Sequence, residues 1–499
     1  MKKKVVATLL TSALAVSMLA GCGNSGGQAA APAAAAPAAS EAPAAAEPAA
    51  EPAPAAEEPA AEEAPAAEET ATADAGAGGV INLWTFTDEV PKMVERYIAD
   101  HPDFPYTVNP TIIATTEGAY QPALDQALIA GGEDQPDLYC AESAFVLKYT
   151  QGDMEDYAMP YKDLGIDIDK EIADSQIASY AVDIGTNTNG EVDGLGYQAT
   201  GGTFIYRRSI AKDVFGTDDP AEISKIIGGG SGSWDKFWEA AKTLADKGCA
   251  IVSGDGDIWH AVENSSDVGW LDENGALQID PKREAFLDIS KNLTDNGWSN
   301  QTQDWQDAWF ADMKGEGDKP VFGFFGPAWL INYTLAPNCG GEAVGEGTYG
   351  DWACCDSPIG FFWGGTWLIA NKNMDPAKVS AVKDLIYWIT LDSSDTGLQY
   401  MWANGTLNGE GGTKDSVASG TVMSKSDGSL DFLGGQNMFD YFVPANDYAN
   451  GKNLTQYDES INQIWRDQVR AYAAGEKDRD SALNDFKQTV ADNLGIDVN

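Results

Sequence analysis

Short apolar runs alternate with helix-like stretches from residue 80 onward. Apolar runs typical of buried strands occupy 80–86, 107–114 and 136–141. The segments between them, 90–100 and 120–131, repeat their apolar positions every three to four residues, as amphipathic helices do. This β-α-β-α-β order predicts an α/β fold with a parallel sheet that is covered by helices on both faces.

Helical periodicity returns further along the chain, at 234–246, 378–390, 461–474 and 481–494. In a parallel α/β sheet the ligand crevice forms from loops at the carboxyl ends of the strands. Polar and aromatic residues that follow the predicted strands are therefore the first candidates for a functional site.

The first 79 residues have a different character, because all 15 Trp, 18 Tyr and 17 Phe lie after them. The chain begins with three lysines at 2–4 and an apolar run at 5–20, and then reads LAGC up to Cys22. This pattern predicts a secretion signal over 1–21, too short for a comfortable membrane span. Its end resembles the lipobox of bacterial lipoproteins, which implies that Cys22 is lipidated.

Residues 22–79 consist largely of Ala, Pro and Glu, with eight prolines between positions 32 and 65. Such a composition cannot build a core, and the prolines block a continuous helix. We therefore expect a disordered tether that holds the folded part away from the membrane.

Charge and composition exclude several classes of protein. The chain carries a net charge of −46, of which residues 80–499 carry −39, so we expect no nucleic-acid partner. Its two histidines, His101 and His260, argue against a histidine-ligated metal centre and offer little for a catalytic pair. No P-loop, H-E-x-x-H or paired C-x-x-C motif is present, so we expect no cofactor and no obligatory metal.

Five cysteines follow Cys22, namely Cys140, Cys249, Cys339, Cys354 and Cys355. An odd number cannot all pair within one chain. Cys339 could form a disulfide with Cys354 or Cys355 in an exported protein, and the alternative is a set of free, partly buried thiols.

Several stretches occur in an order that resembles the family-1 extracellular solute-binding proteins of carbohydrate ABC importers, the maltose-binding-like group. They are LWTFTD at 83–88, DQALIAGG at 125–132, PDL at 136–138, GLGYQ at 194–198, IYRR at 205–208, GFFGPAW at 323–329 and WGGTW at 363–367. No single stretch is decisive, but their joint order covers essentially all of 80–499.

The resemblance implies a type II periplasmic-binding-protein-like fold, in which two α/β lobes hold the ligand in the cleft between them. By this analogy lobe 1 comprises 80–197 and 365–415, and lobe 2 comprises 198–364 and 416–499. It also implies a monomer, not an enzyme, on the extracellular face of the cytoplasmic membrane. This protein would bind a carbohydrate and deliver it to ABC transporter permease subunits that work with a separate ATPase.

A sugar site needs aromatic rings against C–H faces and polar groups against hydroxyls. Four tryptophans stand beside glycines and polar residues where strands or helices end: Trp259, Trp329, Trp363 and Trp402. Polar candidates follow the predicted strands or stand at the expected lobe crossing: Asp88, Glu117, Tyr120, Glu142 and Gln198. We interpret His260 and Glu263, which share a helix face, as structural or as single hydrogen-bond contributors.

Two other functions stay open at this stage. The same fold could bind a cationic solute such as a polyamine or quaternary amine, held by Trp faces and acidic groups. A cell-surface glycoside hydrolase would need two carboxylates about 5–10 Å apart, and acidic residues are plentiful. The β-α order, however, does not match eight equal βα units.

Overall fold

Two main β-sheets organise the residues that the structure describes, which are 78–115, 118–407, 409 and 411–498. This computed structural model gives the first sheet the strand order β2-β1-β3-β8-β4. Its strands are β1 (Gly79–Thr85), β2 (Tyr106–Ile112), β3 (Leu138–Glu142), β4 (Gly194–Gly196) and β8 (Thr366–Ala370). β1 runs parallel to both β2 and β3, which confirms the predicted parallel β-α-β-α-β arrangement, whereas β8 runs antiparallel to β3 and β4.

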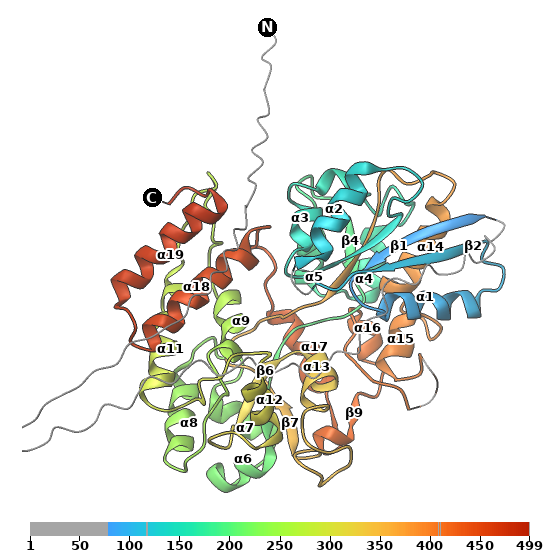
Figure 1. Ribbon diagram of the computed structural model, residues 1–499. Helices are drawn as coiled ribbons and strands as arrows, with labels where there is room; N and C mark the ends of the chain where they lie inside the picture. Colours follow the sequence, from blue (N-terminus) through green and yellow to red (C-terminus); the bar gives the residue numbers. More distant parts are fainter. Residues whose placement is uncertain (1–77, 116–117, 408, 410, 499) are drawn as a thin grey trace, which may run out of the picture. The chain divides into compact units, whose positions relative to one another are not determined.

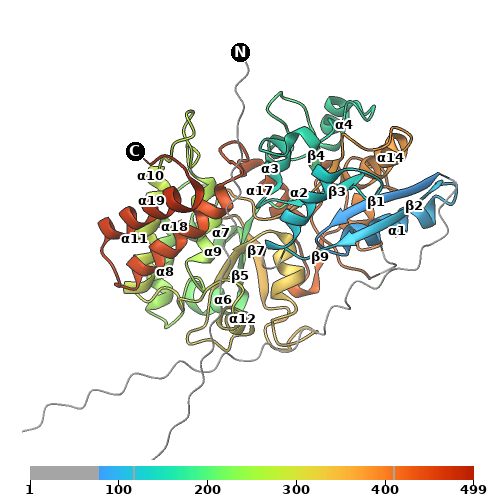
Figure 2. The same ribbon diagram turned by 45° about the horizontal axis from the view of Figure 1, so that its top comes forward.

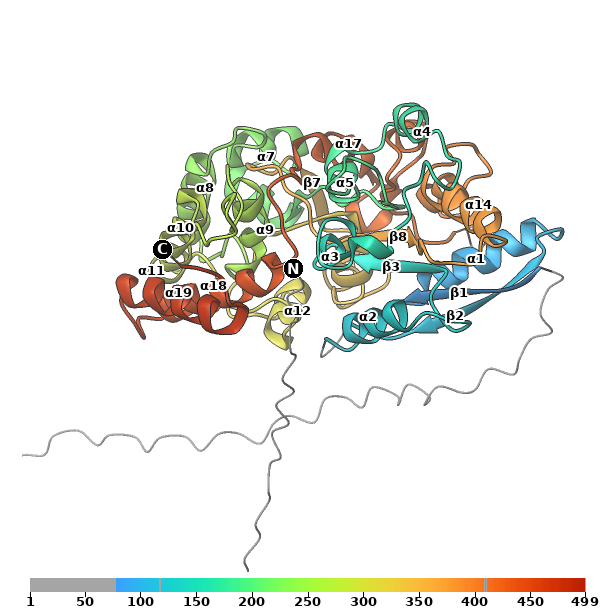
Figure 3. The ribbon, with the colours of Figure 1, turned by 90° about the horizontal axis from the view of Figure 1, so that it is seen from above.

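Helices α1 (Glu89–Asp100) and α2 (Tyr120–Ala130) lie on opposite sides of the β1–β2 pair, as Figures 1 and 3 show. Val90, Met93 and Val94 of α1 and Leu124 and Leu128 of α2 are buried. The helical spacing of these apolar side chains is what lets each helix cover one face of the sheet.

The second sheet is antiparallel, in the order β6-β5-β7. It is formed by β5 (Thr203–Arg207), β6 (Gly323–Gly326) and β7 (Trp352–Cys355), and a separate small hairpin pairs β9 (Ser429–Leu430) with β10 (Gln436–Asn437). Residues 205–207 of the IYRR stretch thus lie in the central strand of a sheet that is buried on both faces, since Phe204, Ile205 and Tyr206 are all inaccessible to solvent.

The remaining helices connect and cover these sheets. They are α3 (Val146–Thr150), α4 (Ile168–Ser175), α5 (Ser179–Ile184), α6 (Arg208–Phe215), α7 (Pro220–Ile227), α8 (Asp235–Ala245), α9 (Gly256–Asn264), α10 (Pro281–Glu284), α11 (Phe286–Asp295), α12 (Asp307–Lys314), α13 (Ala328–Leu330), α14 (Val379–Thr390), α15 (Leu398–Ala403), α16 (Gly420–Met423), α17 (Phe439–Tyr448), α18 (Asp458–Ala473) and α19 (Arg479–Leu494). The four later helices predicted from periodicity are confirmed as α8, α14, α18 and α19. Among the described residues, no helix has both the length and the apolar character needed to cross a bilayer.

Helix α18 begins one turn before its apolar repeat does. The repeat starts at Ile461, but the backbone N–H and hydroxyl of Thr455 both donate to Asp458 Oδ1, at 3.0 and 2.6 Å. This local hydrogen bonding stabilises an extra first turn that the hydrophobic pattern does not reveal. Helix α18 packs on both α19 and α11, and Figure 2 shows the red helices α18 and α19 side by side.

The chain passes between the two sheets in segments that lie side by side. Residues 197–202 lead from β4 to β5, and residues 356–365 return from β7 to β8. Gly201 and Phe362 form an antiparallel bridge, and the Thr200 hydroxyl donates to the Gly364 carbonyl at 2.8 Å. Later in the chain α16 packs on α4, whereas Phe432 stacks on Trp352 of β7. The lobe boundaries given above stay predictions.

Candidate functional site

A cavity of about 410 Å³ opens between the end of β3 and the helices α9 and α18. One wall comes from the end of β3 and the start of α3, beginning at Glu142. The other walls come from α9, from the loop 303–305, from the crossing segment 362–364 and from one face of α18. The volume lies within the range of about 300–1,000 Å³ that small-molecule sites usually occupy.

Three tryptophans meet at this cavity and form what we call the cavity Trp group: Trp305, Trp329 and Trp363. The rings of Trp329 and Trp363 meet edge to face with centroids 4.8 Å apart, and Trp305 lies nearly parallel to Trp329 at 6.2 Å. The Trp329 indole N–H donates to the Trp363 carbonyl at 2.9 Å. The His260 ring stacks on Trp363 at 4.6 Å. Apolar ring surface is therefore presented next to polar groups.

The backbone around this group is specialised. Trp305 has φ +68°, a left-handed conformation that side-chain-bearing residues seldom adopt, and its side chain is 51% exposed. Gly364 has φ +75°, and a Cβ there would lie only 3.2 Å from the Trp329 indole nitrogen. A strained, exposed tryptophan held over a cavity is a mark of a functional surface, because its conformation must be stabilised by the surrounding structure.

Arginines of α18 are paired with aspartates along one edge of the cavity. Arg466 Nη2 lies 2.5 Å from Asp304 Oδ1, and Arg470 lies within 3.7 Å of Asp255, Asp304 and Asp467. Burial alone would raise the pKa of Asp304, but the charge and hydrogen bond of Arg466, a backbone hydrogen bond and the His260 charge together lower the pKa below its ordinary value. These charges hold Gln303 to Trp305 beside α18.

A hydrogen-bonded chain links the cavity to the core. Trp270, which is fully buried, donates its indole N–H to Asn462 Oδ1 at 2.7 Å, and Asn462 Nδ2 donates to Glu263 Oε1 at 2.5 Å. His260 Nδ1 lies 3.7 Å from the other oxygen of Glu263. Burial opposes ionisation of Glu263, yet His260, Arg283 and Asn462 together lower its pKa. Glu263 is thus held as a carboxylate in the cavity wall.

Three further carboxyl groups line the cavity without a cationic partner among the described residues. Glu142 accepts hydrogen bonds from the Ser143 hydroxyl at 2.8 Å and from the Ala144 N–H at 2.7 Å, and burial raises its pKa. Burial raises the pKa of Asp458 to about 7. Burial, with the nearby Glu142 and Glu263 charges, also raises the pKa of Glu459.

Four of the sequence-predicted site residues lie at the cavity or beside it. Glu142, Trp259 and Trp363 line it, and Trp329 contacts Trp363 directly. Trp259 is only 2% exposed and packs on Phe286 with ring centroids 4.9 Å apart, so most of its surface belongs to the core. The structure therefore brings together one predicted carboxylate and two predicted aromatic residues from distant parts of the sequence.

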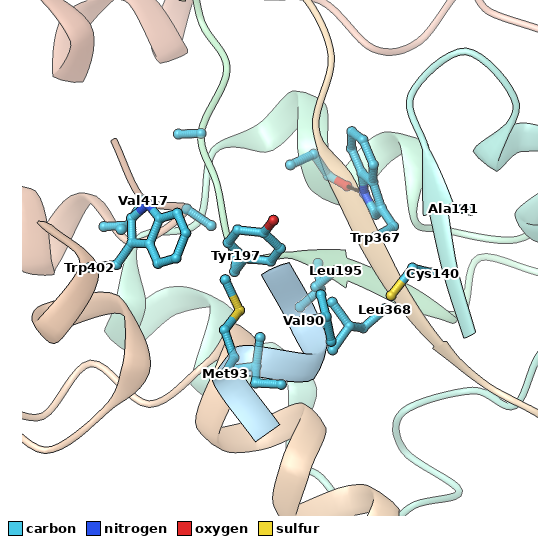
Figure 4. Packing of buried hydrophobic residues seen from close by; sticks show 14 of the residues in the cluster. Val90, Met93, Cys140, Ala141, Leu195, Tyr197, Trp367, Leu368, Trp402 and Val417 are labelled. Atoms are coloured by element: carbon cyan, nitrogen blue, oxygen red, sulfur yellow. Dashed lines mark hydrogen bonds between the residues drawn. The ribbon is translucent and has the colours of Figure 1, made fainter. Parts of the chain in front are cut away.

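Four other predicted residues lie away from this cavity. The exposed Asp88 pairs with Lys92 at 2.5 Å, and the buried Tyr120 donates its hydroxyl to the Cys140 carbonyl at 2.8 Å. Gln198 donates to Asp415 at 3.4 Å, and Trp402 packs its ring 5.8 Å from Tyr197 (Figure 4). Glu117 lies outside the described residues. Ligand contact by these five residues stays a prediction.

Sequence reasoning did not select Trp305, Asp304 or the cavity-lining face of α18. That face presents Glu459, Asn462, Arg466 and Arg470 at helical spacing. The spacing is visible in the sequence, but a polar stripe on an amphipathic helix usually indicates contact with solvent. Trp305 follows Gln303 and Asp304 in a segment without strand or helix signals, so its exposure could not be inferred from its neighbours.

In the described part of the chain the cysteines are unpaired and no metal-binding cluster occurs. Cys140, Cys249, Cys339, Cys354 and Cys355 are all buried and unpaired, so no disulfide joins Cys339 to Cys354 or Cys355. Burial raises the pKa of Cys140 and Cys354 to about 12, which keeps both as thiols at neutral pH. The described residues include no cluster of His, Cys, Asp or Glu that could hold a metal ion.

The fold is that of the two-lobed periplasmic sugar-binding proteins. A crystal structure of an extracellular solute-binding protein of family 1 matches 82% of this chain and 98% of its own, with a TM-score of 0.66 at 18% identity. The galacto-N-biose/lacto-N-biose I-binding protein of an ABC transporter from Bifidobacterium longum covers 85% of this chain and 100% of its own (TM-score 0.61, 16% identity). The sugar-binding protein MalE from Xanthomonas citri covers 83% and 97% (TM-score 0.61, 16% identity). The sequence matches no protein-family model and no curated protein.

Proposed function

We propose that this protein is the substrate-binding component of an ABC importer and that it captures a mono- or oligosaccharide in the 410 Å³ cavity. The observation that carries the proposal is the cavity Trp group, with an exposed and strained Trp305 next to mixed hydrogen-bond donors and acceptors. The similarity in fold to proteins described as binding lacto-N-biose and as sugar-binding supports the same function.

Different side chains of the cavity would bind different parts of a sugar. Indole rings of the cavity Trp group pack against C–H faces, which are the apolar surface of a sugar. Arg466, Asn462 and Gln303 supply N–H donors, and Glu142 and Asp304 supply acceptors, for hydroxyl groups. Because Glu142 ends β3 of the five-stranded sheet whereas Asn462 and Arg466 belong to α18, a ligand that contacts all of them would favour a closed arrangement, which the permease could recognise.

Titration calorimetry with a panel of mono- and oligosaccharides, with polyamines and choline alongside, tests the proposal. We expect saturable binding of at least one sugar, and a loss of about tenfold or more in affinity for Trp363→Ala, since a buried aromatic contact contributes more than about 1.4 kcal/mol. Trp238→Ala removes a tryptophan of α8 that lies outside the cavity and is the matched control. Binding of polyamines and of no sugar would contradict the proposal.

The proposal includes no catalysis. Incubation of the protein with each bound oligosaccharide, followed by chromatography, should return the sugar intact. Release of a shorter sugar that is abolished by Glu142→Gln would instead support the glycoside hydrolase alternative, which requires an acid and a second carboxylate.

We also propose that the protein is anchored outside the cytoplasmic membrane through a lipid on Cys22, a residue outside the described part of the chain. Full-length protein should fractionate with membranes, and Cys22→Ala should release it into the soluble fraction, because a polypeptide without the lipid lacks the anchor. Ser25→Ala is the matched control and should stay with the membrane. A membrane-bound Cys22→Ala variant would contradict lipid anchoring.

A further inference from the structure

Some carboxylates of the cavity form ion pairs with cationic side chains, and others do not. Arg466 and Arg470 are paired with Asp255, Asp304 and Asp467, as described above, and His260 is the cationic candidate nearest Glu263. The described residues that line the cavity include no lysine. None of Glu142, Asp458 and Glu459 forms an ion pair with a described residue, although His260, Arg283 and Arg466 act on them from farther away. We refer to these three as the carboxylate wall.

Members of the carboxylate wall come from distant parts of the chain. Glu142 ends β3 of the five-stranded sheet, whereas Asp458 and Glu459 belong to the first turn of α18, which packs on α11 and α19. Like charges that face one another across a partly enclosed cavity repel, and the repulsion is stronger there than in bulk water. The structure thus accumulates negative charge where a sugar with only hydroxyl groups would need few carboxylates.

Asp458 supplies an independent observation. It lines the cavity, it is only 6% exposed, and its Oδ2 is shielded from solvent and has no hydrogen-bond donor among the described residues. A buried carboxylate oxygen without a donor is destabilising unless a proton or a cation satisfies it. Burial is the main cause of the raised pKa values of Asp458 and Glu459, and it outweighs the nearby positive charges of Arg283, His260 and Arg466.

We propose that the carbohydrate captured by this cavity carries a protonated amine, which binds against the carboxylate wall while its ring packs on the cavity Trp group. This inference rests on the function proposed above and narrows it to amino sugars with a free ammonium group. An ammonium offers three N–H donors and no acceptor, which suits a wall made of acceptors. Its charge is also attracted to the face of a nearby indole.

Matched sets of sugars test the charge of the ligand whichever parent sugar the cavity takes. Each set contains the free amine, the hydroxyl parent and the N-acetyl derivative: glucosamine, glucose and N-acetylglucosamine; galactosamine, galactose and N-acetylgalactosamine; and the β-1,4-linked disaccharides of the first set. In calorimetry at pH 7 we expect the amine of one set to bind at least about tenfold more tightly than its two neutral partners, because charge-assisted hydrogen bonds are about twice as strong as neutral ones.

The variant Glu459→Gln should reduce that preference to about threefold or less and leave the affinity for the neutral partners within about twofold. Glutamine keeps the size of glutamate, and retained binding of the neutral sugars shows that the variant is folded. Glu95→Gln, an exposed carboxylate of α1 outside the cavity, is the matched control and should keep the full preference.

The other possible results of these binding experiments would each contradict a different part of the proposals. Equal or tighter binding of a hydroxyl parent or N-acetyl sugar would overturn the amino-sugar inference and leave the proposed sugar-binding function in place. A preference for the amine that survives in Glu459→Gln would overturn the role of the carboxylate wall. Binding of putrescine or choline with no sugar, or no binding at all, would overturn both proposals.

Discussion

Two groups of tryptophans in this protein have similar ring contacts and different roles. In the cavity Trp group the ring centroids lie 4.8–6.2 Å apart, and in a core group of Trp270, Trp465 and Phe486 they lie 4.9–6.0 Å apart. Trp270 and Trp465 are inaccessible to solvent, whereas half of Trp305 is exposed. Aromatic packing alone therefore does not separate a binding surface from a core, and exposure together with polar neighbours does.

The two groups differ in the backbone that carries them. Trp465 belongs to the long helix α18, where its helical spacing turns it toward α19. Trp329 follows β6 directly, Trp363 precedes two glycines with positive φ, and Trp305 itself has positive φ. Irregular backbone can hold a large ring at a surface, because it does not impose the alternation by which helices and strands bury apolar residues.

The largest expected effect belongs to the core group. Trp465→Ala removes a buried indole and should lower the free energy of unfolding by about 3–5 kcal/mol, because the cavity that remains cannot be filled by its neighbours. Urea unfolding followed by circular dichroism measures the loss. Ligand affinity of the folded fraction should stay within about threefold of wild type. A loss below about 1 kcal/mol would contradict the assignment of Trp465 to the core.

Trp402 is a third kind of tryptophan, because its indole is buried next to the carboxyl group of Asp415. Burial raises the pKa of the fully buried Asp415 from 3.8 to about 8, so this group is protonated in the folded protein at neutral pH and ionised in the unfolded chain. Its contribution to stability should therefore decline as pH rises from about 4 to about 8, by on the order of a few kcal/mol.

Asp415→Asn should remove that decline, because an amide does not titrate and can keep the acceptor for the Ser416 N–H. Urea unfolding of wild type and variant at pH 5, 6, 7 and 8 measures the difference between them. The difference isolates Asp415 from Asp193, Asp257 and Asp458, whose pKa values are also raised, each to about 7. A difference that does not change with pH would contradict the raised pKa of Asp415.

Replacement of Trp305 should weaken ligand binding and hardly change stability, which is the reverse of the effect expected for Trp465. Trp305→Ala is expected to weaken sugar binding about tenfold, or about 1.4 kcal/mol, while the free energy of unfolding changes by less than about 1 kcal/mol. Trp305→Gly should bind as weakly as Trp305→Ala but be more stable by up to about 1 kcal/mol, because glycine adopts positive φ without strain. Equal affinity of wild type and Trp305→Ala would contradict a role for this ring in binding.

The smallest expected effect on ligand affinity belongs to Trp270, a core tryptophan whose indole N–H is hydrogen-bonded to the cavity residue Asn462. Trp270→Phe keeps most of the core packing but removes the indole N–H that holds Asn462, and through it Glu263. We expect ligand affinity to fall about two- to threefold through misplacement of these cavity residues. Calorimetry measures this change, and the matched variant Trp465→Phe, whose indole N–H has no partner among the described residues, should leave affinity unchanged. Equal affinities of Trp270→Phe and wild type would show that the hydrogen-bonded chain does not influence the site.

Much of the fold was predictable because its signals are local. The runs 80–86 and 107–114 were placed within two residues of β1 and β2, and the helical repeat at 481–494 was placed within two residues of α19. The start of α18 was missed by three residues, because a side-chain contact between Thr455 and Asp458 sets it rather than an apolar repeat. That missed turn carries two members of the carboxylate wall.

The candidate site was predictable only in part. Trp329, Trp363 and Glu142 stand next to glycines or at the end of a strand, where a single sequence does indicate a surface. Arg466 and Glu459 lie on a polar helix face that resembles any solvent-exposed face, and Trp305 has no local signal. Their place in the cavity depends on packing of α18 against α11 and α19, which is a long-range property.

The sequence by itself determined the order of strands and helices, the separate character of the first 79 residues and the acidity of the folded part, because periodicity and composition are properties of neighbouring residues. The tertiary structure decided which tryptophans are core and which face the cavity, and it brought Glu142 together with Asp458 and Glu459. Contacts of this kind join residues far apart in the chain, and their energy depends on burial and on distance in space, neither of which is encoded in the local pattern.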